Sequence, residues 1–164
     1  MDVIRRQFTV DEIYQMLDSG ILKDGERLEL IDGKLLTKSP HDPAHSDSVQ
    51  DANGLLVRAF GPGYYVRVQL PLELSNLSEP EPDFAVVTKQ TSRGERHPST
   101  ALLVAEVSNT SLHFDRNRKA SLHANAGIPE YWIINVLQAQ IEVHRLPTTG
   151  GYSEVTILQI HDEV

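Results

Sequence analysis

The sequence contains no cysteine, few aromatic residues and no long apolar segment. The absence of cysteine excludes disulfides, thiolate nucleophiles, zinc fingers and iron–sulfur ligation. No apolar run approaches the roughly 20 residues that a membrane-spanning helix needs, and residues 1–10 are too polar for a signal peptide. We therefore expect a cytoplasmic protein with no membrane partner.

Positive charge is also scarce. The chain has 15 lysine and arginine residues against 23 aspartate and glutamate residues, which gives a net charge of −8. Because phosphate neutralisation needs lysine and arginine, the acidity argues against a protein that coats nucleic acid through bulk charge, although a local basic groove stays compatible with it. The charge is uneven, since residues 89–123 contain six basic and three acidic residues, so that this segment carries +3 and the remainder −11. That distribution fits either a basic strip beside a phosphate-binding site or a solvated segment of mixed charge.

The 164 residues, 40% of them hydrophobic, suit one globular domain, which we expect to span residues 1–164. A capping-box pattern at Thr9 predicts a helix over residues 9–18. Asp32-Gly33 lies between two short apolar runs, which is typical of a β-hairpin. Pro43 suits the first turn of a second helix.

Apolar runs and turn signals predict the remaining elements. The second helix ends before Gly61, and a polar loop covers residues 89–100. A third helix is expected over residues 115–126, and strands are expected over residues 64–74, 84–87, 101–107, 131–134, 141–146 and 152–160. This order predicts an α/β or α+β domain with a mixed sheet of about six or more strands.

Acidic residues interrupt three of the apolar strands. Asp83 opens one strand, Glu106 lies inside another, and Glu29 belongs to the hairpin. A buried carboxylate is costly unless it is paired or binds a metal ion, and Mg²⁺ prefers oxygen ligands. If the strands of Asp83 and Glu106 are neighbours, as sequential strands often are, their carboxylates can meet, and Lys119 on the following helix could stabilise developing negative charge.

The ordered motifs resemble the PD-(D/E)XK restriction-endonuclease-like superfamily and, more narrowly, the Uma-two family of proposed endonucleases. The resemblance covers nearly the whole chain. It rests on Glu29-Leu30-Ile31-Asp32-Gly33, Glu81-Pro82-Asp83, Val104-Ala105-Glu106-Val107-Ser108, Asp115 with Lys119, and Gly127-Ile128-Pro129-Glu130-Tyr131-Trp132. It implies a restriction-endonuclease-like mixed β-sheet core flanked by helices, with an N-terminal helix and a β-hairpin.

The resemblance also implies roles for the site residues. Asp83, Glu106 and the backbone carbonyl of Val107 would ligate Mg²⁺ or Mn²⁺, and Glu29 would complete the acidic site. Ser108 stands where the strand motif of the superfamily has its lysine, so Lys119 would supply that group from the following helix.

Three further residues rank lower as site candidates. His45 matches a recurrent histidine of the family, although a histidine near a helix start is more often a capping or core-edge group. Asp115 could orient Lys119 as an i, i+4 pair, and Gln69 is weaker still. The chain departs from the family pattern at residues 108–111, at His123, where tyrosine is usual, and at its end, where family members continue beyond the last strand.

Each main candidate also has a structural alternative. Asp83 could be a turn residue after proline, and Glu106 could lie at the solvent or pair with Arg116 or Arg118. Glu29 could belong to the polar face of the hairpin, and Lys119 could be exposed.

The leading hypothesis is a metal-dependent nuclease that hydrolyses phosphodiester bonds of nucleic acid, DNA rather than RNA. The alternative is a nuclease-fold binding or interaction module without useful catalysis, motivated by the net acidity and by the altered residues 108–111. A metal-free hydrolase with two carboxylates, as in glycosidases, is a third interpretation. The superfamily often pairs two sites across a duplex, so a homodimer is also expected.

Overall fold

The computed structural model describes residues 5–23, 25–40 and 42–159. Helix α1 (Val10–Asp18) begins with the expected capping box, in which Glu12 N–H donates to Thr9 Oγ1 at 3.2 Å. Strands β1 (Leu28–Ile31) and β2 (Lys34–Thr37) form the predicted hairpin. The turn residues Asp32 and Gly33 both have positive φ, of 48° and 73°, as the Asp-Gly pattern indicated.

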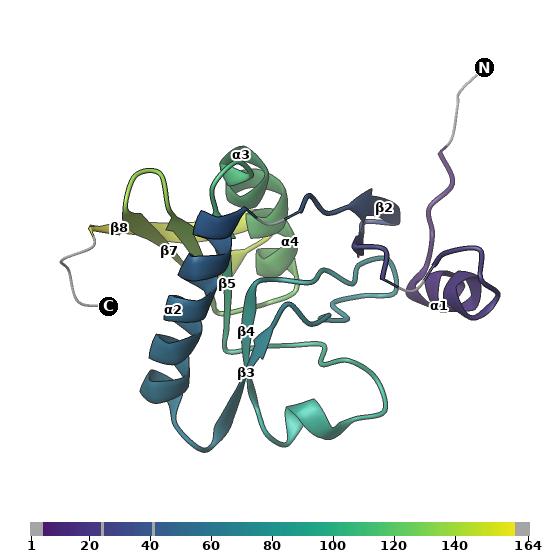
Figure 1. Ribbon diagram of the computed structural model, residues 1–164, viewed down its shortest axis with the longest axis horizontal. Coiled ribbons are helices and arrows are strands. Elements are labelled where there is room, and N and C mark those ends of the chain that lie inside the picture. The colour runs from purple at the N-terminus through teal and green to yellow at the C-terminus, as the bar shows by residue number, and fades with distance from the viewer. Residues whose placement is uncertain (1–4, 24, 41, 160–164) are drawn as a thin grey trace.

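A six-stranded sheet forms the centre of the molecule, in the order β3-β4-β5-β6-β7-β8. Its strands are β3 (Tyr64–Val68), β4 (Phe84–Thr88), β5 (Leu103–Ser108), β6 (Glu130–Asn135), β7 (Gln140–Thr148) and β8 (Gly151–Gln159). Strands β5 and β6 are parallel and the other neighbours are antiparallel. The mixed α+β architecture is therefore confirmed, and Figure 1 shows α1 and β8 at opposite ends of the long axis.

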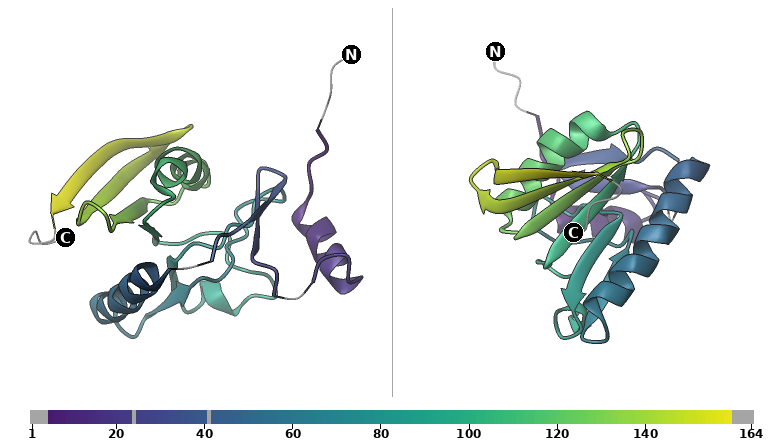
Figure 2. Two further views of the ribbon diagram at one scale, coloured as in Figure 1. Left: turned by 45° about the horizontal axis from the view of Figure 1, so that its top comes forward. Right: turned by 90° about the vertical axis from the view of Figure 1, so that its left-hand side faces the viewer.

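Helices cover both faces of the sheet (Figure 2). On one face, Leu56 of α2 (Pro43–Phe60) packs with Phe84 and Val86 of β4 and with Leu103 and Ala105 of β5. The opposite face is covered by α3 (Leu112–Phe114), the π-helical turn η2 (Asp115–Lys119) and α4 (Ala120–Asn125), whose Ala120 packs with residues of β4, β5 and β6. A third, smaller core joins α1 to the hairpin.

The structure differs from the prediction at two elements. The strand expected over residues 64–74 ends at Val68, because Gln69 adopts a left-handed φ of 52° that a regular strand cannot contain. The helix expected over residues 115–126 begins at Leu112 and contains the π-helical turn.

The remaining differences are small. The loop over residues 89–100 contains a short 3₁₀ turn, η1 (Thr91–Arg93). Residue 160, the expected end of the last strand, lies outside the described residues. No helix in the described part of the chain is both long and apolar enough to cross a membrane.

Candidate active site

The register of β4 and β5 brings Asp83 and Glu106 together. These antiparallel strands pair Phe84 with Ala105, so the next residues, Asp83 and Glu106, lie opposite each other. Asp83 N–H donates to Glu106 Oε2 at 3.3 Å, and Val107 N–H donates to Asp83 Oδ2 at 2.8 Å. Since side chains alternate along a strand, the apolar neighbours face α2 while the two carboxylates face the other side of the sheet.

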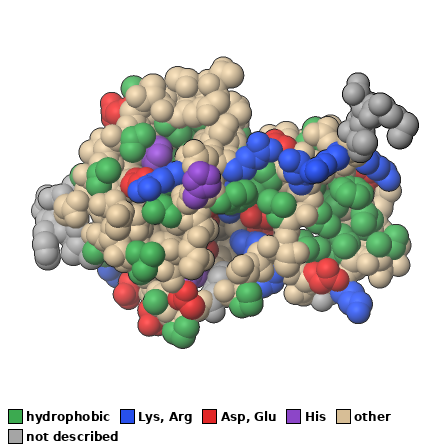
Figure 3. Space-filling model, turned by 90° about the horizontal axis from the view of Figure 1, so that it is seen from above, with side chains coloured by type: hydrophobic (Ala, Val, Ile, Leu, Met, Phe, Trp, Pro, Cys, Tyr) green, Lys and Arg blue, Asp and Glu red, His purple; other side chains and the backbone are tan. Residues whose placement is uncertain are grey.

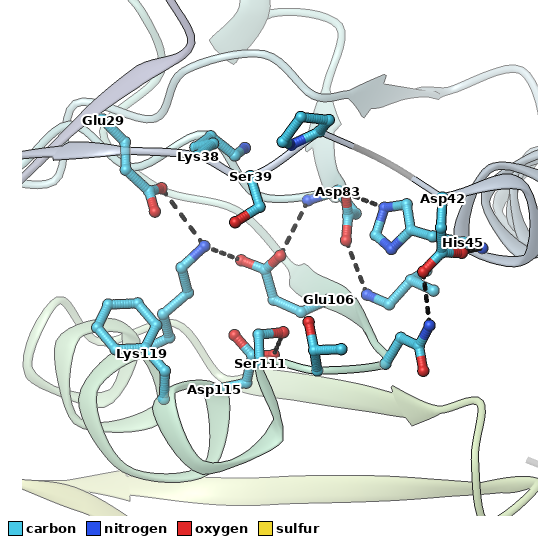
Figure 4. Close-up of a pocket in the computed structure, with 15 residues that line it drawn as sticks. Glu29, Lys38, Ser39, Asp42, His45, Asp83, Glu106, Ser111, Asp115 and Lys119 are labelled. Carbon is cyan, nitrogen blue, oxygen red and sulfur yellow. Dashed lines mark hydrogen bonds and ion pairs between the residues drawn. The ribbon is translucent and has the colours of Figure 1, made fainter.

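Lys119 connects this pair with the hairpin. Its Nζ lies 2.8 Å from Glu106 Oε1 and 3.4 Å from Glu29 Oε2. Glu29, Asp83, Glu106 and Lys119 are only 4–6% exposed, although they come from four separate segments of the chain (Figure 4). The alternative interpretations, in which Glu106, Glu29 and Lys119 are exposed to solvent, are therefore wrong.

The proposed arginine partners of Glu106 also lie elsewhere. Arg116 pairs with Glu142, at 2.5 Å, and Arg118 pairs with Asp32, also at 2.5 Å. Neither arginine is the partner of Glu106, which instead forms its ion pair with Lys119.

Two side chains hold the second oxygen of Asp83. His45 Nε2 lies 3.3 Å from Asp83 Oδ1, and Gln69 Nε2 donates to the same oxygen at 3.1 Å. His45 is placed by the first turn of α2, where Asp42 accepts from His45 N–H at 2.8 Å. Gln69 is placed by its own backbone, whose N–H donates to Asp83 O at 3.1 Å. The structure thus brings both lower-ranked candidates to Asp83.

Asp115 lies at the start of η2 and is buried. It accepts from Ser111 Oγ at 2.5 Å, whereas Lys119, at the other end of η2, directs its ammonium toward Glu106 and Glu29. Asp115 therefore belongs to the same pocket, but its hydrogen-bond partner is the Ser111 hydroxyl and not the expected Lys119.

Burial and local contacts perturb the pKa values of the site. Burial raises the pKa of Asp83, but hydrogen bonds from His45, Val107 and Gln69 outweigh it and lower the pKa to about 2. Burial raises the pKa of Glu106, and the ion pair with Lys119 opposes that rise. Burial alone would lower the pKa of Lys119, yet the carboxylates of Glu106 and Glu29 raise it. Perturbed pKa values of this kind are typical of functional sites.

These groups line a pocket of about 180 Å³ that also contains residues without any sequence signal. Lys38 donates to Glu81 O at 2.6 Å, and Asn109 Nδ2 donates to Asp42 Oδ2 at 2.6 Å. No motif signals these residues, because the linker after β2 and the loop after β5 approach each other only in the folded chain. Figure 3 shows the surface hollowed between the part that carries α1 and the rest, with acidic and basic side chains in the hollow.

The donor set suits a hard divalent cation. Asp83, Glu106 and the backbone of Val107 face the pocket, and Mg²⁺ is commonly held by one or two carboxylates together with water and substrate phosphate. Within the described ranges, no three histidine, aspartate or glutamate side chains form a group that could hold a metal ion by themselves. The residues therefore fit an open two-carboxylate site and not a closed protein cage.

The mixed sheet with helices on both faces is an architecture that a solved structure shares. The crystal structure described as “a putative nuclease belonging to DUF820” from Anabaena variabilis has this fold, with a TM-score of 0.69 and 18% sequence identity. The match covers 92% of this chain and 83% of that chain.

The sequence model of the Uma2 family, described as “Putative restriction endonuclease”, matches residues 10–164. The chain therefore belongs to the Uma2 family, which confirms the resemblance found in its motifs. No curated protein matches the chain.

Proposed function

We propose that the protein hydrolyses phosphodiester bonds of nucleic acid, DNA rather than RNA, with the help of Mg²⁺ or Mn²⁺. The observation that carries the proposal is the charge of the pocket. Five carboxylates line it, from Glu29, Asp42, Asp83, Glu106 and Asp115, against two lysines, so its formal charge is −3 with neutral histidine. A buried excess of negative charge favours a bound cation, and family membership supports a nuclease reaction.

In this proposal Asp83, Glu106 and the carbonyl of Val107 hold the ion. When bound, a divalent ion polarises a phosphoryl oxygen and lowers the pKa of a coordinated water. Lys119 remains an ammonium, because two carboxylates raise its pKa, so it stabilises negative charge on the reacting phosphate and does not accept a proton. Glu29 keeps Lys119 in place.

His45 and Gln69 act on Asp83. Both contact its Oδ1, while Val107 N–H binds Oδ2. These contacts fix the carboxylate and keep it ionised, which is the state that a metal ligand needs. The ring and the amide are therefore positioning groups in this proposal.

Cleavage assays with single- and double-stranded DNA and RNA, with Mg²⁺ or Mn²⁺, test the proposal. We expect Asp83→Asn and Lys119→Met each to lower the rate by about 100-fold or more, since each removes charge stabilisation at the reacting phosphate. The matched controls are Asp51→Asn and Lys34→Met, because both positions are exposed outside the pocket. Equal trace activity in the wild type and the two site variants would contradict the proposal.

A nuclease-fold binding module without useful catalysis is the second candidate. It is favoured by the hydrogen bonding of the two carboxylates, whose four oxygens all accept from protein donors. Titration with Mn²⁺ separates the candidates, because a ligand at 100 times its Kd stabilises a protein by about 2.7 kcal/mol. A rise in melting temperature that Asp83→Asn abolishes supports the nuclease, and no rise at millimolar Mn²⁺ supports the module.

The expected homodimer and the expected cytoplasmic location stay predictions. Light scattering on the purified protein measures the number of copies in solution, and fractionation of the producing cells measures the location. Neither property is needed for the assignment of Asp83, Glu106 and Lys119.

A further inference from the structure

We infer that the pocket accepts one unpaired strand of DNA and that the ring of Phe114 stacks on a base beside the reacting phosphate. This inference rests on the proposed function, because it names the substrate class of the same site. Three observations support it: the reacting groups are buried in the pocket, several arginines are paired with carboxylates, and Phe114 lines the pocket.

The reacting groups lie at the floor of the pocket and not on an open surface. Glu29, Asp83, Glu106 and Lys119 are only 4–6% exposed. One wall comes from the linker after β2, with Lys38, Ser39 and Pro40, and the facing wall comes from the loop after β5, with Asn109, Thr110 and Ser111. The hydrogen bond of 2.6 Å from Asn109 to Asp42 ties these walls together on the side of His45 (Figure 4).

A continuous duplex fits such a pocket poorly. DNA duplexes stay stiff over about 150 base pairs, so their phosphates remain on the outside of a wide cylinder. The floor of a pocket of about 180 Å³ is therefore out of reach for a paired strand. An unpaired strand can bend at each nucleotide and bring one phosphate to the floor.

Half of the ten described arginines are paired with carboxylates, which reduces the charge available for duplex binding. Duplex affinity grows with the number of phosphates that free lysine and arginine side chains neutralise. Ion pairs with carboxylates engage five of the described arginines: Arg6, Arg96, Arg116, Arg118 and Arg145. The pocket contains Lys38 and Lys119, which also lie near carboxylates, at 3.9 Å from Glu81 and 2.8 Å from Glu106. So few cations suit contact with only a few phosphates of a short strand.

Phe114 supplies the kind of surface that unpaired bases bind. It lines the pocket directly before η2, the turn that ends in Lys119, and it is half-buried. Proteins that bind single strands combine basic groups with aromatic side chains on which bases stack, and such stacking tolerates any base. Phe114 can therefore hold the base next to the phosphate that faces Lys119.

The test compares one labelled 20-nucleotide DNA as a free strand and annealed to its complement. Affinity is measured by fluorescence anisotropy in EDTA, and cleavage is measured with Mn²⁺. We expect the free strand to bind at least tenfold more tightly and to be cleaved at least tenfold faster than the duplex. In a duplex with a central unpaired bubble, we expect the cuts to fall in the bubble.

Phe114→Leu tests the stacking surface while it keeps an apolar side chain at this position. We expect it to weaken binding of the free strand about tenfold and to leave the melting temperature and the Mn²⁺ affinity unchanged. The matched control is Tyr65→Leu, because Tyr65 is an exposed aromatic of β3 that pairs with Val87, four residues along the chain from Asp83. This control should bind the free strand like the wild type.

Each result decides a different claim. Equal binding and cleavage of the duplex would overturn the inference and leave phosphodiester hydrolysis standing. Preferential binding of the free strand without any cleavage would support the inference and contradict the proposed hydrolysis. If neither DNA is bound or cleaved, both claims fail, and an unchanged affinity in Phe114→Leu would overturn the role of its ring.

Discussion

The buried lysine of the pocket keeps its charge because two carboxylates hold it. An isolated ammonium in a buried site loses its proton readily, but Lys119 lies 2.8 Å from Glu106 and 3.4 Å from Glu29. Glu106 has a second task, since its other oxygen accepts from the backbone N–H of Asp83. The contacts of Glu106 therefore keep Lys119 charged and hold Glu106 itself in a fixed orientation beside Asp83.

A buried histidine behind Lys119 makes stability depend on pH. The ring of His123 is 0% exposed and lies 5.1 Å from the ring of Tyr131, and its nitrogens have no hydrogen-bond partner among the described residues. Burial, and then Lys119, lowers its pKa from 6.5 to about 3. Below pH 6.5 the unfolded chain therefore binds a proton that the folded chain does not, so acid lowers the free energy of unfolding.

We expect this histidine to cost about 2 kcal/mol of stability between pH 6.5 and pH 5. Urea unfolding at the two pH values measures the cost, and His123→Phe should reduce the loss by about that amount. His113→Phe is the control, because His113 is exposed, and it should keep the wild-type dependence. An unchanged pH dependence in His123→Phe would show that the ring is protonated in the folded protein.

At the scale of elements, contacts between neighbouring strands could be predicted from the sequence, whereas contacts made by irregular linkers could not. Asp83 and Glu106 could be paired from the sequence, because they mark consecutive strands and such strands are often neighbours. The contact of Lys38 with Glu81 could not be predicted, because it depends on the path of a linker without regular structure.

Strand β3 is shorter than its alternating sequence pattern predicted. Alternation favoured a strand through residue 74, but the left-handed Gln69 ends β3 at Val68 and turns its amide toward Asp83. The π-helical turn was missed in the same way, because the sequence pattern of an α-helix does not reveal it. Such local departures are frequent at functional sites.

The hairpin that carries Glu29 depends on a close contact at its turn. Gly33 has a φ of 73°, and a Cβ at this position would clash with Gln7 Cβ. We expect Gly33→Ala to lower the free energy of unfolding by about 2–3 kcal/mol, which combines backbone strain with a steric clash. Gly20→Ala is the matched control, because its φ of 74° is similar but a Cβ there would meet no described atom within 4 Å beyond its chain neighbours. Chemical denaturation of both variants measures the difference, and equal losses would contradict the clash.

At the scale of the whole molecule, acidity and nucleic-acid binding are compatible because the carboxylates are divided between surface ion pairs and the pocket. The net charge of −8 includes carboxylates that neutralise surface arginines and others that line the pocket. The basic excess of residues 89–123 is thereby reduced on the surface, since Arg96, Arg116 and Arg118 are bound to carboxylates. The pocket carries excess negative charge, so its attraction for DNA depends on its two lysines and on a bound divalent cation.

This division of charge predicts a weak salt dependence of DNA binding. Each phosphate neutralised on a single strand contributes about −0.7 to the slope of log affinity against log salt, so two pocket lysines give a slope of about −1.4. Lys38→Met should reduce the slope to about −0.7, because it removes one of these cations, whereas Lys34→Met, at an exposed position of β2, should not change it. Anisotropy titrations of the free strand at several salt concentrations measure these slopes. A wild-type slope steeper than about −4 would require more than five phosphate contacts and would place the binding surface outside the pocket.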